Sequence, residues 1–326
     1  MIRTSGGRMA IAVAMLAGCL VSEASAQGYP NRPIRMIAPF PAGGLADVLA
    51  RAVGDEISKA LGQPIIVENR AGAGGNVGAD AVAKAEPDGY TLLMSSAGIL
   101  SANQFLYAKM PFEPEKAFVP VSLVADMPIL LLVHPKVGAK TAQEFLALAR
   151  ANPGKFNFGS PGIGTTGHLA LAYFMHLANV KITHVPYRGA APSVQDLVAG
   201  QTDGTFDNPP TVISHIRAGS ILPLGVTAKE RLSLLPDVPT MIEGGVPGFV
   251  ASSWFGVVAP AGTPPEIVKQ LSAEIAKAVR LPALQRFPRD SGARLVGNTP
   301  EEFAQFIRDE RTKWGEIIKA AGIKAD

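Results

Sequence analysis

The chain has 326 residues, of which 47% are hydrophobic and 17% are charged, and its 30 Lys and Arg nearly balance its 27 Asp and Glu. A chain of this length has room for two globular domains, since a domain usually has about 100 to 200 residues. The formal net charge of +3 comes without a run of Lys or Arg, which argues against a nucleic-acid or membrane-surface binder.

The first residues have the pattern of an export signal. Arg3 and Arg8 precede an apolar run at residues 9–21, and small residues follow at 24–26. This order of charge, apolar core and cleavage site is typical of a secretory signal peptide. We therefore predict that residues 1–26 are removed and that the remaining chain is periplasmic.

A second interpretation of the same segment stays open. Residues 16–19, Leu-Ala-Gly-Cys, have the form of a lipoprotein signal, in which Cys19 would be lipidated and tether the chain. Cys19 is the only cysteine. A chain cut after Ala26 would contain none, so its stability could not depend on disulfides.

From residue 34 onward, short β-rich runs alternate with helical patterns, which favours βαβ units. The first series predicts strands at 34–40, 64–68 and 90–95, with helices at 46–61 and 77–85. The second series predicts strands at 129–133, 155–159, 181–187 and 202–206, with helices that begin near 141, 165 and 191. A last strand is predicted at 252–258, followed by helices that begin near 264 and 300.

Both ends of the chain therefore carry the same kind of unit, on either side of a similar middle block. We predict an α/β protein of two lobes, each a mixed sheet flanked by helices. Lobe 1 would contain residues 27–126 and 250–326, and lobe 2 residues 127–249. Two crossings, near 124–130 and 248–254, would join them.

Four segments match the S/T-x-x-E capping box, in which a side chain at each end satisfies a free backbone N–H. They predict helix starts at Thr141, Thr240, Thr263 and Thr299.

Ligands of parallel α/β sheets bind where strands end and helices begin, because free N–H groups and positive dipole ends lie there. The junction at 39–47 is a glycine-rich loop that either contacts a ligand or forms only a capped turn. The junction at 71–78 is richer in glycine but poor in polar side chains, so we interpret it as a surface turn. Ser95, Ser96 and Gly98 form a third junction.

The junction at 159–168 invites a nucleotide hypothesis, because residues 162–167 fit G-x-G-x-x-G. The acidic residue expected about 20 positions later is absent, and Arg188 stands in that region. Thr165 also replaces the lysine that a phosphate-binding loop needs. We therefore predict no cofactor. A glycine-rich turn with hydroxyl donors at Ser160, Thr165 and Thr166 suits a carboxylate as well as a phosphate.

The sequence gives little support for a catalytic or a metal-binding site. No G-x-S-x-G motif occurs. Ser160, His168 and Asp207 are the residue types of a catalytic triad, but in a chain of this length such a combination is no evidence of one. The histidines show no metal-binding spacing: His134, His168, His176, His184 and His215. We predict a protein that is not an enzyme and binds no metal.

Many ordered motifs resemble the Bug-type periplasmic solute-binding proteins of tripartite tricarboxylate transporters, over essentially the whole chain after residue 26. The matching residues are 29–30, 32–34, 39–47, 50–51, 67–70, 72–75, 87–90, 152–154, 159–168, 184–187, 206–207, 235–240 and 254–256.

The resemblance implies a Venus-flytrap receptor, similar to type II periplasmic binding proteins, whose lobes close on a carboxylic acid. It implies lobe 1 contacts at Phe40, Ala42, Gly43, Gly44, Asp47, Ser95 and Gly98. It implies lobe 2 contacts at Ser160, Gly162, Ile163, Gly164, Thr165, Thr166, His168, Tyr187 and Asp207. The implied partners are a small carboxylate and membrane transporter subunits, with no nucleic acid, and we expect a monomer.

One departure from the family concerns the ligand. Many members continue Ala-Gly-Gly with another glycine and a Thr or Ser, where this chain has Leu45 and Ala46. We therefore expect the distal part of the ligand to be less polar than a tricarboxylate, as in an aromatic or aliphatic acid. Two other functions stay open: a ligand sensor for a signalling receptor, and a periplasmic hydrolase on the same scaffold.

Overall fold

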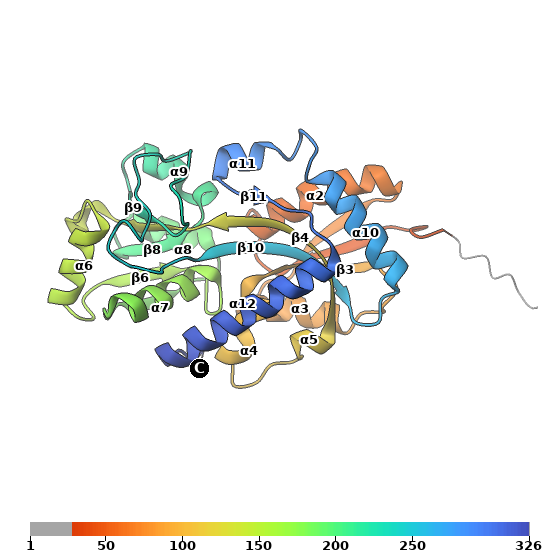
Figure 1. Ribbon diagram of the computed structural model, residues 1–326, viewed down its shortest axis with the longest axis horizontal. Helices are drawn as coiled ribbons and strands as arrows, with labels where there is room; N and C mark the ends of the chain where they lie inside the picture. Colours follow the sequence, from red (N-terminus) through yellow and green to blue (C-terminus); the bar gives the residue numbers. More distant parts are fainter. Residues whose placement is uncertain (1–27, 326) are drawn as a thin grey trace, which may run out of the picture.

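The computed structural model describes residues 28–325, which form two β-sheets with helices on both faces (Figure 1). This confirms the predicted α/β fold with two lobes. The predicted signal peptide and Cys19 lie outside the described residues. Among residues 28–325, no helix is both long and apolar enough to cross a membrane.

The sheet of lobe 1 has the strand order β11-β4-β10-β3-β1-β2. Strands β1, β2 and β3 run parallel, whereas β10 is antiparallel to both of its neighbours and β11 is antiparallel to β4. The bounds are β1 Ile34–Ala38, β2 Ile65–Asn69, β3 Thr91–Ser96, β4 Phe118–Pro128, β10 Ser252–Pro260 and β11 Arg294–Leu295.

Side chains that alternate along these strands are covered by different helices. On β1, Ile34 and Met36 pack in one cluster with α2 (Leu45–Leu61) and α10 (Pro265–Ala278). Ile37 packs in another cluster with α3 (Asn76–Ala83) and the start of α12 (Pro300–Ala321). This is the period of two expected of a strand buried on both faces. The shorter helices of this part are α4 Asn103–Leu106, α5 Pro114–Ala117 and α11 Arg286–Ser291.

The sheet of lobe 2 has the order β7-β6-β8-β5-β9, with β5 antiparallel to β8 and β9 and the β6 pairs parallel. Its strands are β5 Leu130–Val133, β6 Asn157–Ser160, β7 Thr183–Pro186, β8 Gly204–Asp207 and β9 Leu222–Val226. One face packs on α6 (Ala142–Ala151) and α7 (Thr166–Ala178), and the other on α8 (Ala190–Val198) and α9 (Pro209–Arg217).

Thr227 joins the two segments that cross between the sheets. Its hydroxyl accepts from the backbone N–H of Ile129 at 2.9 Å and lies 2.6 Å from the carbonyl oxygen of Ala251. The hydroxyl is buried. A buried hydroxyl that bonds to both crossings holds them side by side and gives the two lobes a defined connection.

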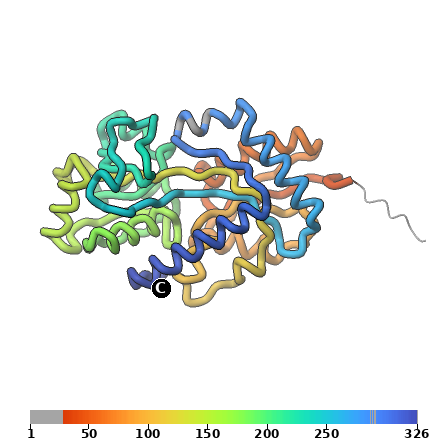
Figure 2. The backbone as a smooth tube through the Cα atoms, viewed as in Figure 1, coloured from red at the N-terminus to blue at the C-terminus, as the bar shows by residue number. Residues whose placement is uncertain are grey.

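The C-terminal helix α12 is a third connection between the lobes. It begins beside the lobe 1 sheet, where Phe303 is buried, and ends with Trp314 and Ile318 in the main core cluster of lobe 2. Figure 2 shows this segment in blue, crossing from one half of the molecule to the other. The lobe boundaries expected from the sequence remain a proposal, and α12 belongs by its contacts to both lobes.

Of the four predicted helix starts, Thr299 forms a full reciprocal capping box and Thr141 caps α6. The predicted start at Thr240 was wrong, and the predicted capping box at Thr263 does not form, although α10 begins at Pro265, close to the predicted position. Thr240 and Glu243 bond to each other reciprocally, but only turns follow them. At Thr263 the hydroxyl donates to the carbonyl of Pro260 at 2.8 Å, so the cap position of α10 falls on Pro264.

Candidate functional site

Four helices of the two lobes begin at one cavity of about 400 Å³. Their cap residues all line it: Gly44 of α2, Thr165 of α7, Gly189 of α8 and Asn208 of α9. No side chain of these four caps accepts from its helix's first N–H groups. Free N–H groups of α2, α7 and α8 therefore border the cavity, whereas α9 begins with Pro209 and Pro210, which have no N–H and leave it only its dipole. The four positive dipole ends and these N–H groups favour an anion.

The loop before α2 is shaped by Asp47. Asp47 Oδ2 accepts from the N–H of Gly43 at 2.9 Å, and Asp47 Oδ1 accepts from Arg51 at 2.9 Å and Asn69 at 3.0 Å. Burial opposes ionisation, but these hydrogen bonds hold the pKa of Asp47 below its usual value. Gly43 has φ +79°, a backbone conformation that favours glycine. Asp47 therefore fixes the loop and does not itself line the cavity.

The loop before α7 closes on itself. Thr165 Oγ1 donates to the carbonyl of Gly162 at 2.6 Å, and the N–H of Gly164 donates to His168 Nδ1 at 3.2 Å. Ser160 Oγ lies 2.6 Å from Nε2 of His184, whose ring stacks on that of His168 with centroids 4.2 Å apart. Burial lowers the pKa of His168 to about 3 and that of His184 to about 4, so both rings are neutral at pH 7.

A hydrolase would need Ser160, His168 and Asp207 to act together. In the structure each of the three forms its hydrogen bonds with other groups and not with one another. Ser160 is fully buried and bonds to His184, while His168 bonds to its own loop. Asp207 Oδ1 accepts from the backbone N–H of Asn208 at 2.7 Å. Of the three residues only Asp207 lines the cavity. The described residues hold no group of three His, Cys, Asp or Glu placed to bind a metal.

The structure brings part of the predicted site together. The predicted residues that line the cavity are Phe40, Ala42, Gly43, Gly44, Thr165, Thr166 and Asp207. The predicted residues outside its lining are Asp47, Ser95, Gly98, Ser160, Gly162, Ile163, Gly164, His168 and Tyr187. Tyr187 donates to Asp196 at 2.7 Å, and burial together with this carboxylate raises its pKa to about 12.

Several of the outlying glycines lie where the two lobes touch. A Cβ on Gly98 would stand 2.2 Å from the carbonyl oxygen of Gly164, and one on Gly74 would stand 2.5 Å from that of Ile163. The hydroxyl of Tyr107 also donates to the Ile163 carbonyl, at 3.3 Å. Loop 71–78, interpreted from sequence as a surface turn, thus supplies one side of this contact between the lobes.

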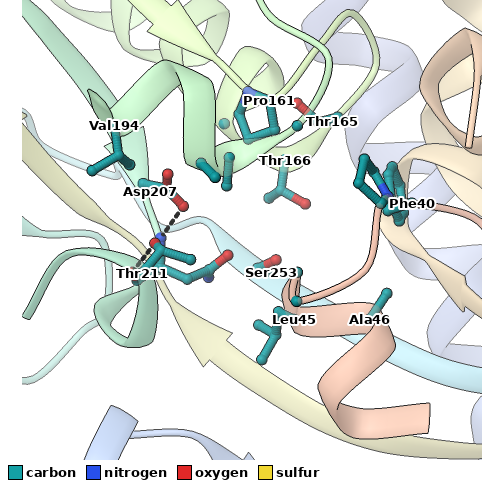
Figure 3. A pocket seen from close by; sticks show the side chains of 18 of the residues that line it. Phe40, Leu45, Ala46, Pro161, Thr165, Thr166, Val194, Asp207, Thr211 and Ser253 are labelled. Atoms are coloured by element: carbon teal, nitrogen blue, oxygen red, sulfur yellow. Dashed lines mark hydrogen bonds between the residues drawn. The ribbon is translucent and has the colours of Figure 1, made fainter. Parts of the chain in front are cut away.

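Further residues line the cavity that the sequence prediction did not include. They are Pro41, Leu45, Ala46, Ser96, Ile129, Pro161, Gly167, Arg188, Gly189, Ala190, Ala191, Pro192, Val194, Gln195, Phe206, Asn208, Thr211, His215, Ser253 and Phe255. Figure 3 shows Leu45, Val194 and Ser253 around the same space as Thr166 and Asp207. The junctions after β7 and β8 follow the rule used for the other loops, so Gly189 and Asn208 were within reach of sequence reasoning.

A family model and two curated relatives each match most of the chain. The family model described as "Tripartite tricarboxylate transporter family receptor" matches residues 49–323. BugT of Bordetella pertussis is 39% identical over 306 residues, covering 94% of each chain. A UPF0065 protein from the tcbD-tcbE intergenic region of Pseudomonas sp. strain P51 is 40% identical over 316 residues, covering 96% of this chain and 94% of that protein.

Three solved structures of similar proteins have the same fold as this chain. Rpa4515 of R. palustris with adipate has a TM-score of 0.87 and 36% identity, covering 91% of this chain and 99% of that one. MatC of Rhodopseudomonas palustris with bound malate has a TM-score of 0.84 and 34% identity, covering 89% and 100%. The periplasmic binding protein BugD has a TM-score of 0.85 and 33% identity, covering 91% and 99%.

Proposed function

Since this chain belongs to the tripartite tricarboxylate transporter receptor family, we propose that it is a periplasmic receptor that encloses a small carboxylic acid between its lobes. The receptor then delivers the acid to membrane transporter subunits. The observation that carries the proposal is the convergence of four helix N-termini on one cavity. Relatives of known structure with adipate and with malate support the choice of a carboxylate over a phosphate.

The cavity lining bears on which acid fits. Leu45, Val194 and Phe255 line it together with Ile129 and Phe206, and its charged or titratable side chains are few: Arg188, Asp207 and His215. A second ionised carboxylate would need a cationic partner. That partner would have to be Arg188, which is exposed. We therefore propose a ligand with one carboxylate held by the helix N-termini and a largely apolar body.

The direct contacts that we propose are the seven predicted residues that line the cavity. Asp47, Ser160, His168 and Tyr187 act as supports, because each is bonded within its own lobe. Gly162 bonds to Ser160 and Thr165 within its own loop, and Gly98, Ile163 and Gly164 act where the lobes meet. Closure of the lobes then selects and encloses the acid.

A thermal-shift panel tests the proposal, with malate, adipate, hexanoate and benzoate as probes. A ligand at 100 times its dissociation constant stabilises the folded state by about 2.7 kcal/mol, which raises the melting temperature of lobes of this size by roughly 5 to 10 °C. Inorganic phosphate serves as the competing anion. If none of the acids shifts the melting temperature and phosphate does, the carboxylate assignment is wrong.

Uptake of the identified acid in a strain that lacks the gene separates a transport receptor from a sensor. A transport receptor predicts loss of uptake, whereas a sensor that docks on a signalling receptor leaves uptake unchanged. Light scattering of the purified protein, with and without the acid, tests the expected monomer.

A further inference from the structure

Asp207 is a buried carboxyl with one oxygen that has no partner in the protein. The residue is 3% exposed, lies at the end of β8 and lines the cavity (Figure 3). Its Oδ1 accepts from the N–H of Asn208, but no described group donates to Oδ2. The nearby Thr211 hydroxyl bonds to the carbonyl of Asn208 at 2.7 Å. An unpaired buried carboxylate oxygen is costly, so Oδ2 needs either a donor or a proton.

The surroundings of Asp207 offer no cation to it. In the described part of the chain no ion pair joins Asp207 to a basic side chain. The neighbouring strands β5 and β6 carry no charged residue. The charged or titratable side chains on the packed helices and cavity wall are Asp196 on α8, His215 and Arg217 on α9, His168, Tyr173 and His176 on α7, and Arg188.

Burial raises the pKa of Asp207 from 3.8 to about 6, although the hydrogen bond from the Asn208 N–H favours the ionised form. Before an acid binds, Asp207 is therefore mostly ionised at pH 7 but close to protonation. The four helix N-termini draw an anion into the same cavity. A second negative charge nearby raises the pKa of a carboxyl further, as in any pair of carboxylates that share a site.

On the basis of the proposed function, we propose that Asp207 takes up one proton from solvent when an anionic acid binds, and that Oδ2–H then donates a hydrogen bond to the acid. The net charge of the site stays unchanged on binding, since one proton enters with one carboxylate. A carboxyl-to-carboxylate hydrogen bond is short and charge-assisted, which makes it stronger than a neutral one. Asp207 thus makes the affinity of the receptor depend on pH.

Isothermal titration calorimetry tests this with hexanoate, a monocarboxylate of the proposed class, or with benzoate if it gives the larger thermal shift. Titrations at pH 7.5 in HEPES and in Tris, whose ionisation enthalpies differ, give the number of protons taken up, which we expect to approach one. Above pH 6 the affinity falls by up to about tenfold per pH unit, the slope of one coupled proton.

Asp207→Asn removes the titration and keeps the shape. Its amide oxygen can still accept from the Asn208 N–H, and its NH₂ group is a permanent donor where Oδ2 stood. We expect this variant to bind with no proton uptake and with an affinity that is flat between pH 5.5 and 8. The matched control is Asp237→Asn, an exposed aspartate of the same lobe that does not line the cavity. It should keep the proton uptake of the wild type.

Binding without proton uptake in the wild type would overturn the proposal and leave the proposed function intact. The absence of any acid that binds would overturn both. Carbon-13 NMR of the aspartate carboxyls of the wild type, with and without the acid, provides a readout that needs no variant. One carboxyl signal should move to the protonated position at pH 7 when the acid is added, and an unmoved signal contradicts the proposal.

Discussion

Trp254 and Trp314 donate their indole N–H groups to the same oxygen of Glu310, at 2.9 and 3.0 Å. Trp254 belongs to a core cluster of lobe 1, and Trp314 belongs to the main cluster of lobe 2. Glu310 lies between them on α12. One carboxylate therefore joins the cores of the two lobes through the C-terminal helix.

Glu310→Gln should weaken this junction, because a charged acceptor of two buried N–H groups becomes a neutral one. We expect a loss of about 1 to 3 kcal/mol in the free energy of unfolding, measured by urea unfolding. The chain has only these two tryptophans, so their fluorescence follows the junction directly. Asp309→Asn, an exposed neighbour on the same helix, is the control and should unfold like the wild type. Equal stability of the two variants contradicts the role given to Glu310.

Gly74→Ala should keep the lobes apart. The new Cβ would stand 2.5 Å from the carbonyl oxygen of Ile163, so the close approach of the lobes is lost. We expect weaker ligand binding and a larger radius of gyration in X-ray scattering with ligand present. Gly62→Ala is a matched control, since Gly62 has a similar φ of +67° against +62° but nothing near its Cβ. Both variants pay the cost of a left-handed backbone, about 1 kcal/mol, and only Gly74→Ala should lose affinity.

Leu45→Ala should change which acids bind. Leu45 lines the cavity and also packs against the core cluster beneath α2. Removing its contact with an apolar ligand body should cost roughly 1 to 2 kcal/mol, or about tenfold in affinity for hexanoate. Malate, which has little apolar surface, should lose less. Val48→Ala, exposed on the same helix, controls for helix effects. An equal loss for both acids would indicate that Leu45 serves the fold alone.

The stacked pair of His168 and His184 should make the protein sensitive to acid. Both pKa values are lowered by burial, to about 3 and about 4, so the unfolded chain binds more protons than the folded one below pH 6.5. Their contribution to stability is present above pH 6.5 and is lost as the pH falls toward 4. Urea midpoints measured from pH 7 to pH 4 should therefore fall steeply.

His184→Gln should make that pH dependence shallower, because one of the two titrating groups is gone. His176→Gln, an exposed position on α7, should leave the slope unchanged. A wild-type midpoint that stays constant down to pH 4.5 would rule out the histidine pair as the acid-sensitive element.

The sequence by itself determined the local elements and the family. The alternation of apolar runs located β1 to β3, β5 to β8 and β10, together with α2, α3, α6, α7 and α8, since strand and helix periods depend on neighbours a few residues apart. It did not locate β4, β9 or α9. The Thr299 box fixed the start of α12 for the same reason. The glycine-rich junctions at 39–47 and 159–168 indicated where helices would begin at a ligand site.

Only the tertiary structure decided how these pieces meet. The antiparallel pairing of β4 with β10 joins residues more than 100 positions apart, and no local pattern specifies it. The contact of Gly74 with Ile163, the two tryptophans on Glu310 and the burial of Asp207 also depend on distant segments. The residues that line the cavity were partly predictable because they follow strand ends. The unpaired oxygen of Asp207 was not predictable, because burial and the lack of a donor exist only once β8 and its neighbours pack together.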